Sequence, residues 1–330
     1  MIVAFNKNIK LIINYVAGPL IMLFLFYAVA RQLAKQPHWQ ESLHQMLQAA
    51  LGQQRWKLYS MIGLMGVNWA LESYKWQIAL KPVQPIRFLR AFKAVLAGTC
   101  IASFTPNRVG EYLGRMLFVD QGNKILSIAP TILCSMSQML VTLAAGTLGV
   151  YLFSSLPYHF DASWTTPSFF KAAGVVVAAG AIGLGLVYFR FDPLVKRVNQ
   201  WIRKNERTFS IPDNFRFTTL TRILLISVIR YSVFLLQYYL LFSLFGIPLF
   251  PQQVFTGVSV MFVLMAIVPT LTFLTDLGFR WIAGIQIFQV YTMNTAGILA
   301  VSLGVWLINL IIPALVGSLL ILRIKLFQNK

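Results

Sequence analysis

The sequence predicts an all-α polytopic membrane protein, with about six full spans and two re-entrant helical hairpins of opposite orientation that form inverted repeats. Composition is the first observation: 58% of the 330 residues are hydrophobic and 11% are charged, whereas about a quarter of a soluble domain is charged. The apolar residues gather into runs of about 20, the length of one membrane crossing. The net charge of +19 comes from Lys and Arg that lie mainly between these runs. This placement indicates loops beside anionic lipid rather than a nucleic-acid partner.

Six apolar runs are long enough to cross a membrane. The first, 11–30, follows Lys7 and Lys10 as in a signal peptide, but it is long for a signal-peptide core, so we expect a retained helix. The other runs are 58–80, 125–153, 170–189, 222–245 and 295–322. Regions 88–118 and 252–292 are also largely apolar, but a proline followed by charged residues interrupts each of them. Each region is therefore either an ordinary helix pair or a hairpin that returns to its side of entry.

The loop charges indicate which side of the membrane each loop faces, because short cytoplasmic loops collect Lys and Arg. The basic loop 190–222 is rich in both and is expected in the cytoplasm. The loops 154–167 and 246–253 contain neither and are expected outside. We therefore expect a multi-pass protein of the cell inner (plasma) membrane, with cytoplasmic N- and C-termini.

Both interrupted regions are then predicted to be re-entrant hairpins. Lys81 precedes region 88–118 and Lys124 follows it, so this region enters and leaves on the cytoplasmic side. Region 252–292 starts outside and must return there, because the last span has to end inside at Arg323. The two hairpins thus approach the membrane midplane from opposite sides.

The predicted chain is a single transmembrane domain, 1–330, with an internal symmetry. The first half-repeat, the connecting span and the second half-repeat cover about 58–153, 170–189 and 222–322. The hairpins also resemble each other: Pro106 precedes EYLGR and Pro269 precedes DLGFR, and both motifs have an acid four residues before an arginine. Many secondary transporters build their substrate site from inverted repeats with broken helices at the midplane.

The first hairpin contains residues typical of an anion site. Thr105 is a favourable N-cap and Pro106 suits the first helical position, so a helix is expected to start there, inside the membrane. Its free N–H groups and positive dipole end attract anions, and Arg108 adds a full charge within the first turn. The second hairpin can restart its helix with Thr275 or Asp276 as cap. Two helix N-termini would then face each other and cradle a phosphate or carboxylate.

The acids and arginines of the hairpins allow two interpretations. Glu111 and Arg115, like Asp276 and Arg280, have the favourable acid-first i, i+4 spacing and can simply neutralise each other. Alternatively they contact substrate, because a charge at the bilayer centre costs about 3 kcal/mol and is seldom retained without a use. The sequence favours substrate contact without excluding the structural pairs.

The second half of the chain supports substrate contact, because charge is scarce there. Between 223 and 322 the only charged residues are Arg230, Asp276 and Arg280, and charged residues inside membrane segments are usually functional. We expect Asp276, like its counterpart Glu111, to offset the arginine charge or to carry a coupling proton. Phosphate is expected to bind to Arg108, Arg115 and Arg280.

Two further helices contribute candidate substrate-binding residues. Glu72 and Lys75 lie between two tryptophans in VNWALESYKWQIAL, so they are either site residues or interfacial anchors whose charges reach the membrane surface. Arg230 has Gln237 seven residues later on the same helical side. A role in the cavity is favoured for Arg230 and Gln237 over snorkelling to the inner leaflet.

Four segments carry a family resemblance: TPNRVGEYLGR, NWALESYKW, IRYSVFLLQ and VPTLTFLTDLGFR. They resemble the lysylphosphatidylglycerol synthase transmembrane-region family, whose members are also called flippase-like membrane proteins, and the resemblance covers most of the chain. Its most specific part is a Pro-x-Arg-x-Gly-Glu element formed by Pro106, Arg108, Gly110 and Glu111. The resemblance implies movement of a polar lipid between leaflets.

The chain also departs from the family pattern. The two-part synthases append a soluble aminoacyl-transferase domain, whereas this chain ends at Lys330 directly after its last expected span, so we expect that domain to be absent. Pro269-Thr-Leu-Thr-Phe stands where the family has a glycine-rich Pro-x-x-x-Gly-Gly-x-Gly stretch. The substrate therefore stays open, and the expected partners are membrane lipids with an anionic or phosphate-bearing headgroup.

These features predict a flippase-like translocase rather than an enzyme. No nucleophile with an adjacent base is evident, no Walker A sequence occurs, and no catalytic residue, cofactor or metal site is expected. One alternative is a lipid-modifying transferase that uses Glu111 or Asp276 as base. Another is an assembly partner for a cell-envelope enzyme. A separate lipid-synthesis or glycosyltransferase enzyme is a candidate partner of the translocase.

Overall fold

The chain folds into a bundle of helices. The computed structural model describes residues 54–156, 167–204, 215–267 and 273–322, together with Tyr27, Gln40, His44, Gln48 and Gly52. Within these residues all regular structure is helical and no strand occurs, which confirms the all-α class. The predicted first span, 11–30, apart from Tyr27, and the predicted break at Val268–Pro269 lie outside the described residues.

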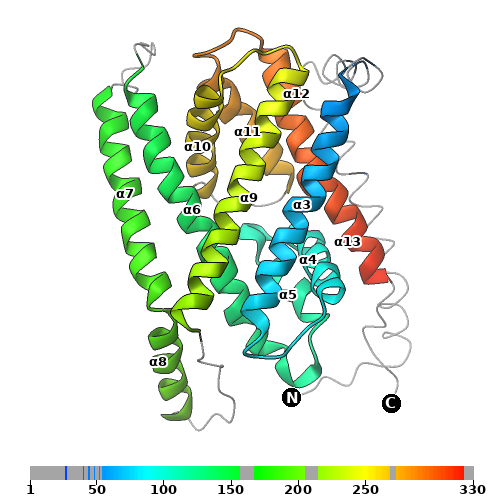
Figure 1. Ribbon diagram of the computed structural model, residues 1–330, viewed down its shortest axis with the longest axis vertical. Coiled ribbons are helices and arrows are strands. Elements are labelled where there is room, and N and C mark those ends of the chain that lie inside the picture. Colours follow the sequence, from blue (N-terminus) through cyan, green and yellow to red (C-terminus); the bar gives the residue numbers. More distant parts are fainter. Residues whose placement is uncertain are drawn as a thin grey trace.

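The helix bounds follow the apolar runs of the sequence closely. The α-helices are α3 Arg55–Leu80, α4 Phe88–Ala102, α5 Gly110–Met116, α6 Ile128–Ser154, α7 Pro167–Phe189, α8 Phe191–Lys204, α9 Phe217–Leu244, α10 Pro251–Ile267, α11 Phe273–Phe288, α12 Thr295–Trp306 and α13 Ile312–Leu322. Short 3-10 turns cover Pro106–Arg108, Gln121–Asn123 and Ile125–Ser127, and a π-helical segment, Leu307–Ile311, joins α12 to α13. The helices α3 and α9 pack side by side in the middle of the bundle (Figure 1).

Four predicted spans are confirmed as helices long and apolar enough to cross a membrane: Ile125–Ser154, Ser168–Phe189, Phe217–Leu244 and Thr295–Ile321. The predicted span 58–80 also forms one helix, α3, whose 26 residues extend about 39 Å. Charged residues, among them Glu72 and Lys75, lower the hydropathy of α3. The predicted last span is not one continuous α-helix, because the π-helical segment interrupts it.

The two interrupted regions form helix pairs. The helix α4 packs along α5, and α10 packs along α11. Figure 1 shows the first pair in the lower half of the molecule and the second pair in the upper half. With seven residues, α5 extends only about 10 Å, so it is too short to cross a hydrocarbon core of about 30 Å. The helix α11 begins at Phe273, so the predicted caps Thr275 and Asp276 lie within its first turn rather than before it.

The predicted helix start at Thr105 is wrong in one respect. Thr105 has extended backbone angles and Pro106 follows it at a first helical position, but the helix is a three-residue 3-10 turn. Arg108 then adopts a left-handed backbone with φ 59°, and α5 begins only at Gly110. Thr105 nevertheless acts as a local cap, because its Oγ1 accepts a hydrogen bond from the Gly110 N–H at 2.7 Å.

The two halves of the chain pack on each other reciprocally. The helix α6 of the first half packs against α10 of the second, and α13 of the second half packs against α4 of the first. Gly146 of α6 and Gly317 of α13 approach their partner helices so closely that a Cβ at either position would overlap. The contacted residues are four positions apart in both helices: Ser259 and Val263 in α10, and Leu96 and Cys100 in α4.

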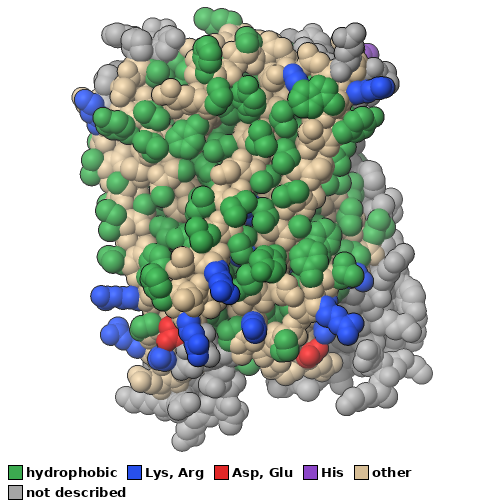
Figure 2. Space-filling view, viewed as in Figure 1, with side chains coloured by type: hydrophobic (Ala, Val, Ile, Leu, Met, Phe, Trp, Pro, Cys, Tyr) green, Lys and Arg blue, Asp and Glu red, His purple; other side chains and the backbone are tan. Residues whose placement is uncertain are grey.

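The surface has the polarity expected of helices that face lipid. Figure 2 shows hydrophobic side chains over the middle of the visible face, with Lys and Arg gathered toward the end at which α8 lies. The helix α7 lies at the edge of the bundle and exposes Val175, Val176, Ile182 and Leu186. An apolar belt with cationic residues beside it is the pattern of a membrane-embedded helical protein.

Candidate functional site

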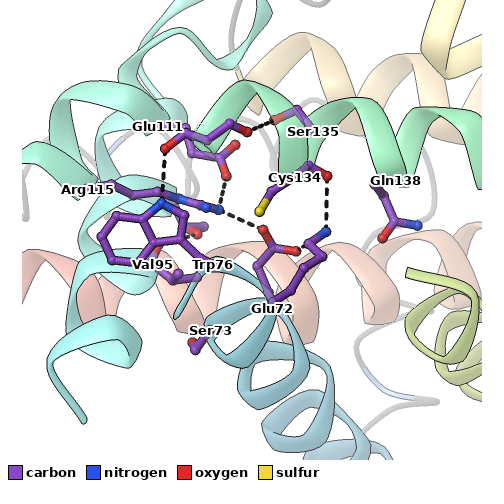
Figure 3. A network of polar contacts seen from close by, with 12 residues as sticks. Glu72, Ser73, Trp76, Val95, Glu111, Arg115, Cys134, Ser135 and Gln138 are labelled. Atoms are coloured by element: carbon purple, nitrogen blue, oxygen red, sulfur yellow. Dashed lines mark hydrogen bonds and ion pairs between the residues drawn. The ribbon is translucent and has the colours of Figure 1, made fainter. Parts of the chain in front are cut away.

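A buried cluster of charges joins the two halves of the chain at Glu72. The Glu72 carboxylate on α3 forms ion pairs with Lys75 at 2.7 Å, with Arg115 of α5 at 2.8 Å and with Arg230 of α9 at 2.6 Å. Arg115 also pairs with Glu111, one turn earlier on α5. Figure 3 shows Arg115 between the Glu111 and Glu72 carboxylates. A single carboxylate thus holds together cations from three helices.

Lys75 belongs to this cluster and is not an interfacial anchor. Its side chain is 1% exposed, and its ammonium group also donates hydrogen bonds to the Cys134 carbonyl at 3.2 Å and to the Ser227 hydroxyl at 3.4 Å. A buried ammonium is unfavourable unless it is paired, and these contacts provide the pairing. The snorkelling interpretation of Glu72 and Lys75 is therefore wrong.

Arg230 also points into the bundle rather than toward the membrane surface. Its Nε donates to Asn68 Oδ1 at 2.6 Å, and its Nη1 donates to Glu72 Oε2 at 2.6 Å and to Gln138 Oε1 at 3.3 Å. The guanidinium lies 5.6 Å from the ring centroid of Trp69. These contacts hold the Arg230 side chain between the first and second halves of the chain.

Two cavities meet at Arg230. The first, which we call the Asn309 cavity, has a volume of about 230 Å³ and lies between the two interrupted regions and the junction of α12 with the π-helical segment. Its apolar wall includes Trp69 and Met265. Its polar lining residues are Ser103, Thr105, Arg108, Arg230, Asp276, Arg280 and Asn309.

The second cavity, which we call the Gln138 cavity, has a volume of about 350 Å³ and lies against α6. Its polar lining residues are Glu72, Lys75, Arg108, Glu111, Ser135, Gln138, Thr142 and Arg230. Both cavities are lined by Trp69, Arg108, Arg230 and Met265. The two cavities are therefore adjacent, with two arginines in their common wall.

Arg108 differs from the other cations of the site. Its side chain lines both cavities, and no ion pair or hydrogen bond joins this side chain to another residue in the described part of the chain, although the Arg108 N–H donates to the Thr105 carbonyl. It is also the one non-glycine residue with positive φ among the described residues. A left-handed backbone is unfavourable for a side-chain-bearing residue and is found preferentially at functional sites. Arg108 is thus a cation available for a ligand.

The second hairpin contributes Asp276 and Arg280 to the Asn309 cavity. Arg280 pairs with Asp276 at 3.2 Å, one turn earlier on α11, and donates from Nη1 to the Tyr238 hydroxyl on α9 at 2.8 Å. The first hairpin has the same arrangement, in which Arg115 binds Glu111 and then Glu72 on α3. The partners differ in charge, because Tyr238 is a neutral phenol where Glu72 is a carboxylate.

The charges leave the site electropositive. Lys75, Arg108, Arg115 and Arg230 face only Glu72 and Glu111, which gives this group a net charge of +2. The Asp276–Arg280 pair adds no net charge. Lys75 and Arg115 are buried whereas Arg108 is exposed, so this excess attracts an anion with part of its charge accessible from outside. Within the described residues no cluster of His, Cys, Asp or Glu suitable for a metal ion occurs.

The structure brings most of the predicted residues to the two cavities and leaves three outside them. Arg115 is 1% exposed behind Glu72 and lines neither cavity. Pro106 lines neither, although its neighbours do. Gln237 is fully buried against α3, where its Nε2 donates to the Met61 carbonyl at 3.4 Å, so its predicted place in the site is wrong. Helical periodicity predicts that Gln237 lies on the same side of α9 as Arg230. That part of α9, however, packs against α3.

Three amides of the site were missed: Asn68, Gln138 and Asn309. Asn68 and Gln138 accept hydrogen bonds from Arg230, and Asn309 lies on the π-helical segment. Their one signal in the sequence is a polar residue inside an apolar run. That signal is weak, since buried amides often serve packing or helix contacts alone.

Comparison with protein families identifies the transmembrane part of a known group. A family model described as "Lysylphosphatidylglycerol synthase TM region" matches residues 15–317 of the chain. We found no curated protein that matches the sequence. The matched range includes every residue that lines the two cavities.

Proposed function

The chain belongs to the lysylphosphatidylglycerol synthase transmembrane-region family, and on this premise we propose that it is a membrane translocase that moves a phosphate-bearing lipid between leaflets. The headgroup passes through the two cavities while the acyl chains stay in the bilayer. The role is transport rather than catalysis, and a separate lipid-synthesis or glycosyltransferase enzyme supplies the lipid. The protein resides in the inner (plasma) membrane with both termini in the cytoplasm.

The reciprocal packing of the two halves supports an inverted repeat. Exchanging α3 with α9, α4 with α10, α5 with α11 and α6 with α12–α13, the π-helical segment included, maps the contacts among these helices onto one another, while α7 and α8 have no counterpart. The same exchange relates Gly146 to Gly317 and the pairs of residues that these glycines contact. It also relates the two cavities, since one lies beside α6 and the other beside α12. Such symmetry is typical of transporters in which two halves move against each other around a central site.

The helix lengths support re-entrant hairpins. The seven residues of α5 are too few to cross the membrane, which supports a region 88–118 that enters and leaves on one side. The concentration of Lys and Arg near α8 in Figure 2 supports the assignment of that side to the cytoplasm. The second hairpin, α10–α11, then enters from the exterior, and residues of both hairpins line the cavities.

Arg108 is the observation that carries the proposal. Among the described residues it has no carboxylate partner, it lines both cavities, and its backbone is held in the left-handed region. A guanidinium that is free of a carboxylate binds phosphate oxygens through charge-assisted hydrogen bonds, and Arg108 is exposed to an incoming headgroup. Arg108 can also follow the headgroup from one cavity to the other, because it belongs to the wall of both.

The same charges restrict the headgroup. The cluster has a net charge of +2, and its carboxylates are already paired with buried cations. A headgroup with net negative charge is attracted, whereas a lysyl group would bring a further cation into an electropositive cavity. The substrate proposed here is therefore an anionic phospholipid rather than its lysylated derivative.

The test is leaflet transfer by the purified full chain in phosphatidylcholine vesicles. Trace amounts of acyl-labelled phosphatidylglycerol, lysylphosphatidylglycerol or phosphatidylcholine are added, and a membrane-impermeant quencher reports the outer-leaflet fraction over time. We expect fast transfer of phosphatidylglycerol and slow transfer of the other two lipids. Equal rates for all three lipids, or rates equal to those of protein-free vesicles, contradict the proposal.

A further inference from the structure

Asn309 is a buried amide in the wall of the Asn309 cavity. It lies within the π-helical segment Leu307–Ile311, between α12 and α13. Only 8% of the residue is exposed, and neither its Oδ1 nor its Nδ2 has a hydrogen-bond partner among the described residues. Arg108 and Arg280 line the same cavity. π-helical turns are rare and often occur at functional sites.

An alignment of Gly146 with Gly317, the glycines that contact residue pairs four positions apart on α10 and α4, pairs Gln138 with Asn309. Gln138 precedes Gly146 by eight residues on α6, and Asn309 precedes Gly317 by eight residues on the π-helical segment and α13. Both glycines pack against the first helix of the hairpin of the other half. The two amides therefore occupy equivalent positions, one in each cavity.

The two amides differ in their hydrogen bonds. Gln138 Oε1 accepts from Arg230 at 3.3 Å, so a residue of the protein satisfies it. In the described chain Asn309 has no such donor or acceptor. Buried amide groups are nearly always hydrogen-bonded, and an unpaired one is unfavourable. Asn309 lines the same cavity as Arg108 and Arg280, but its amide atoms have almost no accessible surface. A ligand in that cavity therefore reaches the amide only when the Asn309 side chain turns toward it.

We propose that the Asn309 amide binds a hydroxyl group of the lipid headgroup while Arg108 and Arg280 hold the phosphate. This inference rests on the proposed function and specifies its substrate. A carboxamide presents one acceptor and two donors, and a hydroxyl, which both donates and accepts, matches it. A phosphate oxygen offers no hydrogen to Oδ1. The ligand class is thus an anionic phospholipid whose headgroup carries a hydroxyl beyond the phosphate.

A matched pair of lipids tests this directly on the unaltered protein. Phosphatidylglycerol and phosphatidylpropanol carry the same charge and the same number of headgroup carbons, but only the first has hydroxyl groups. Native mass spectrometry of the full chain, titrated with each lipid, gives the two dissociation constants. Loss of one buried hydrogen bond predicts about tenfold weaker binding of phosphatidylpropanol.

Variants then assign the preference to Asn309. Asn309→Leu is expected to weaken phosphatidylglycerol binding about tenfold and to leave phosphatidylpropanol binding unchanged. Gln237→Leu is the control, because it removes a buried amide that lines neither cavity, and it should retain the preference. Asn309→Ser keeps a small hydrogen-bond donor and acceptor, so it should retain part of the preference for phosphatidylglycerol. This variant replaces Asn309→Leu in the test if Asn309→Leu does not fold.

The outcomes separate this inference from the proposed function. Equal binding of the two lipids by the unaltered protein overturns the inference. If Arg108→Gln weakens the binding of both lipids in that case, the phosphate site and the proposed function are still supported. A preference that survives in both Asn309 variants also overturns the role of Asn309. If neither lipid binds the unaltered protein, the proposed function fails and the inference fails with it.

Discussion

Arg230 on α9 donates a hydrogen bond to Glu72 on α3 at 2.6 Å, across the contact between the two halves of the chain. The same carboxylate pairs with Lys75 and Arg115. Glu72 is 4% exposed, so these charges attract each other with little screening by water. The pairing makes Glu72 a structural link between α3, α5 and α9 as well as a wall of the Gln138 cavity.

Replacing Glu72 with Gln should destabilise the protein strongly, because Lys75 and Arg230 lose their carboxylate partner in the cluster and Arg115 keeps only Glu111. Breaking a buried ion pair on one side costs about 3 to 5 kcal/mol. The control is Asp120→Asn, which removes a pair with Arg90 whose side chains are 46% and 64% exposed; such surface pairs contribute less than about 1 kcal/mol. Thermal unfolding of both variants in detergent measures the difference, and equal losses would show that the Glu72 cluster is not structural.

Exchanging the charges of the first hairpin should not restore function. The double change Glu111→Arg with Arg115→Glu preserves the pair on α5, but it places a new carboxylate beside Glu72, with which Arg115 is paired at 2.8 Å. We expect each single change and the double change to lower both the melting temperature and leaflet transfer. A double variant that regains the transfer rate of the parent would show that Glu111 and Arg115 only neutralise each other and have no further role in transfer.

The second hairpin supplies the matched comparison. The neighbour of Arg280 on α9 is the Tyr238 hydroxyl, which can accept from a guanidinium or donate to a carboxylate. The double change Asp276→Arg with Arg280→Asp should therefore be folded and nearly as stable as the parent in the same thermal assay. If both double variants lose the same amount of thermal stability, then the difference between Glu72 and Tyr238 as neighbours of the exchanged arginines does not affect stability.

The reciprocal contact of α13 with α4 predicts an intolerant glycine. A Cβ at Gly317 would overlap the Leu96 carbonyl oxygen, which is backbone and cannot rotate away. Gly317→Ala should cost about 1 to 3 kcal/mol, and thermal unfolding measures it. Gly183→Ala on α7 meets open space and should be neutral or stabilise the helix by up to about 1 kcal/mol. A tolerated Gly317→Ala would contradict the close approach of α13 to α4.

Labelling of single cysteines tests the orientation on which the inverted repeat depends. With Cys100 and Cys134 both buried, new cysteines at Ser155 and Gln252 should react with an impermeant thiol reagent in intact cells. Lys196→Cys on α8 should react only after the membrane is opened. Labelling of Lys196→Cys in intact cells reverses the assigned topology and removes the argument for opposite hairpins.

The sequence predicts the long helices well, because a run of about 20 apolar residues has the length that one helical membrane crossing needs. It also predicts the interruption at Pro106, since proline marks a helix start or break. It does not predict that Arg108 turns the backbone to φ 59° and delays α5 to Gly110. That conformation depends on tertiary contacts, which a local pattern of caps and helix formers does not contain.

The site was predicted in part for the same reason. Charges in apolar runs are costly, so Glu72, Arg108 and Arg230 stand out from sequence alone. Which charge pairs with which, however, depends on how α3, α5 and α9 meet. Arg115 was predicted to bind phosphate, yet Glu72 holds it away from both cavities. The sequence gives only a weak signal for Asn309, a polar residue inside an apolar run, because the π-helical turn itself leaves no pattern in the sequence.

The most direct test of the central claim is leaflet transfer of phosphatidylglycerol by Arg108→Gln in vesicles. Gln keeps hydrogen bonding but removes the charge, so binding should weaken by about 1.5 to 3 kcal/mol, which is about ten- to a hundredfold. Arg108→Lys should fall between, because Lys lacks the planar fork that grips two phosphate oxygens. Arg90→Gln, an exposed arginine outside both cavities, is the control and should transfer lipid like the parent. A folded Arg108→Gln variant with the parent's transfer rate would contradict the account.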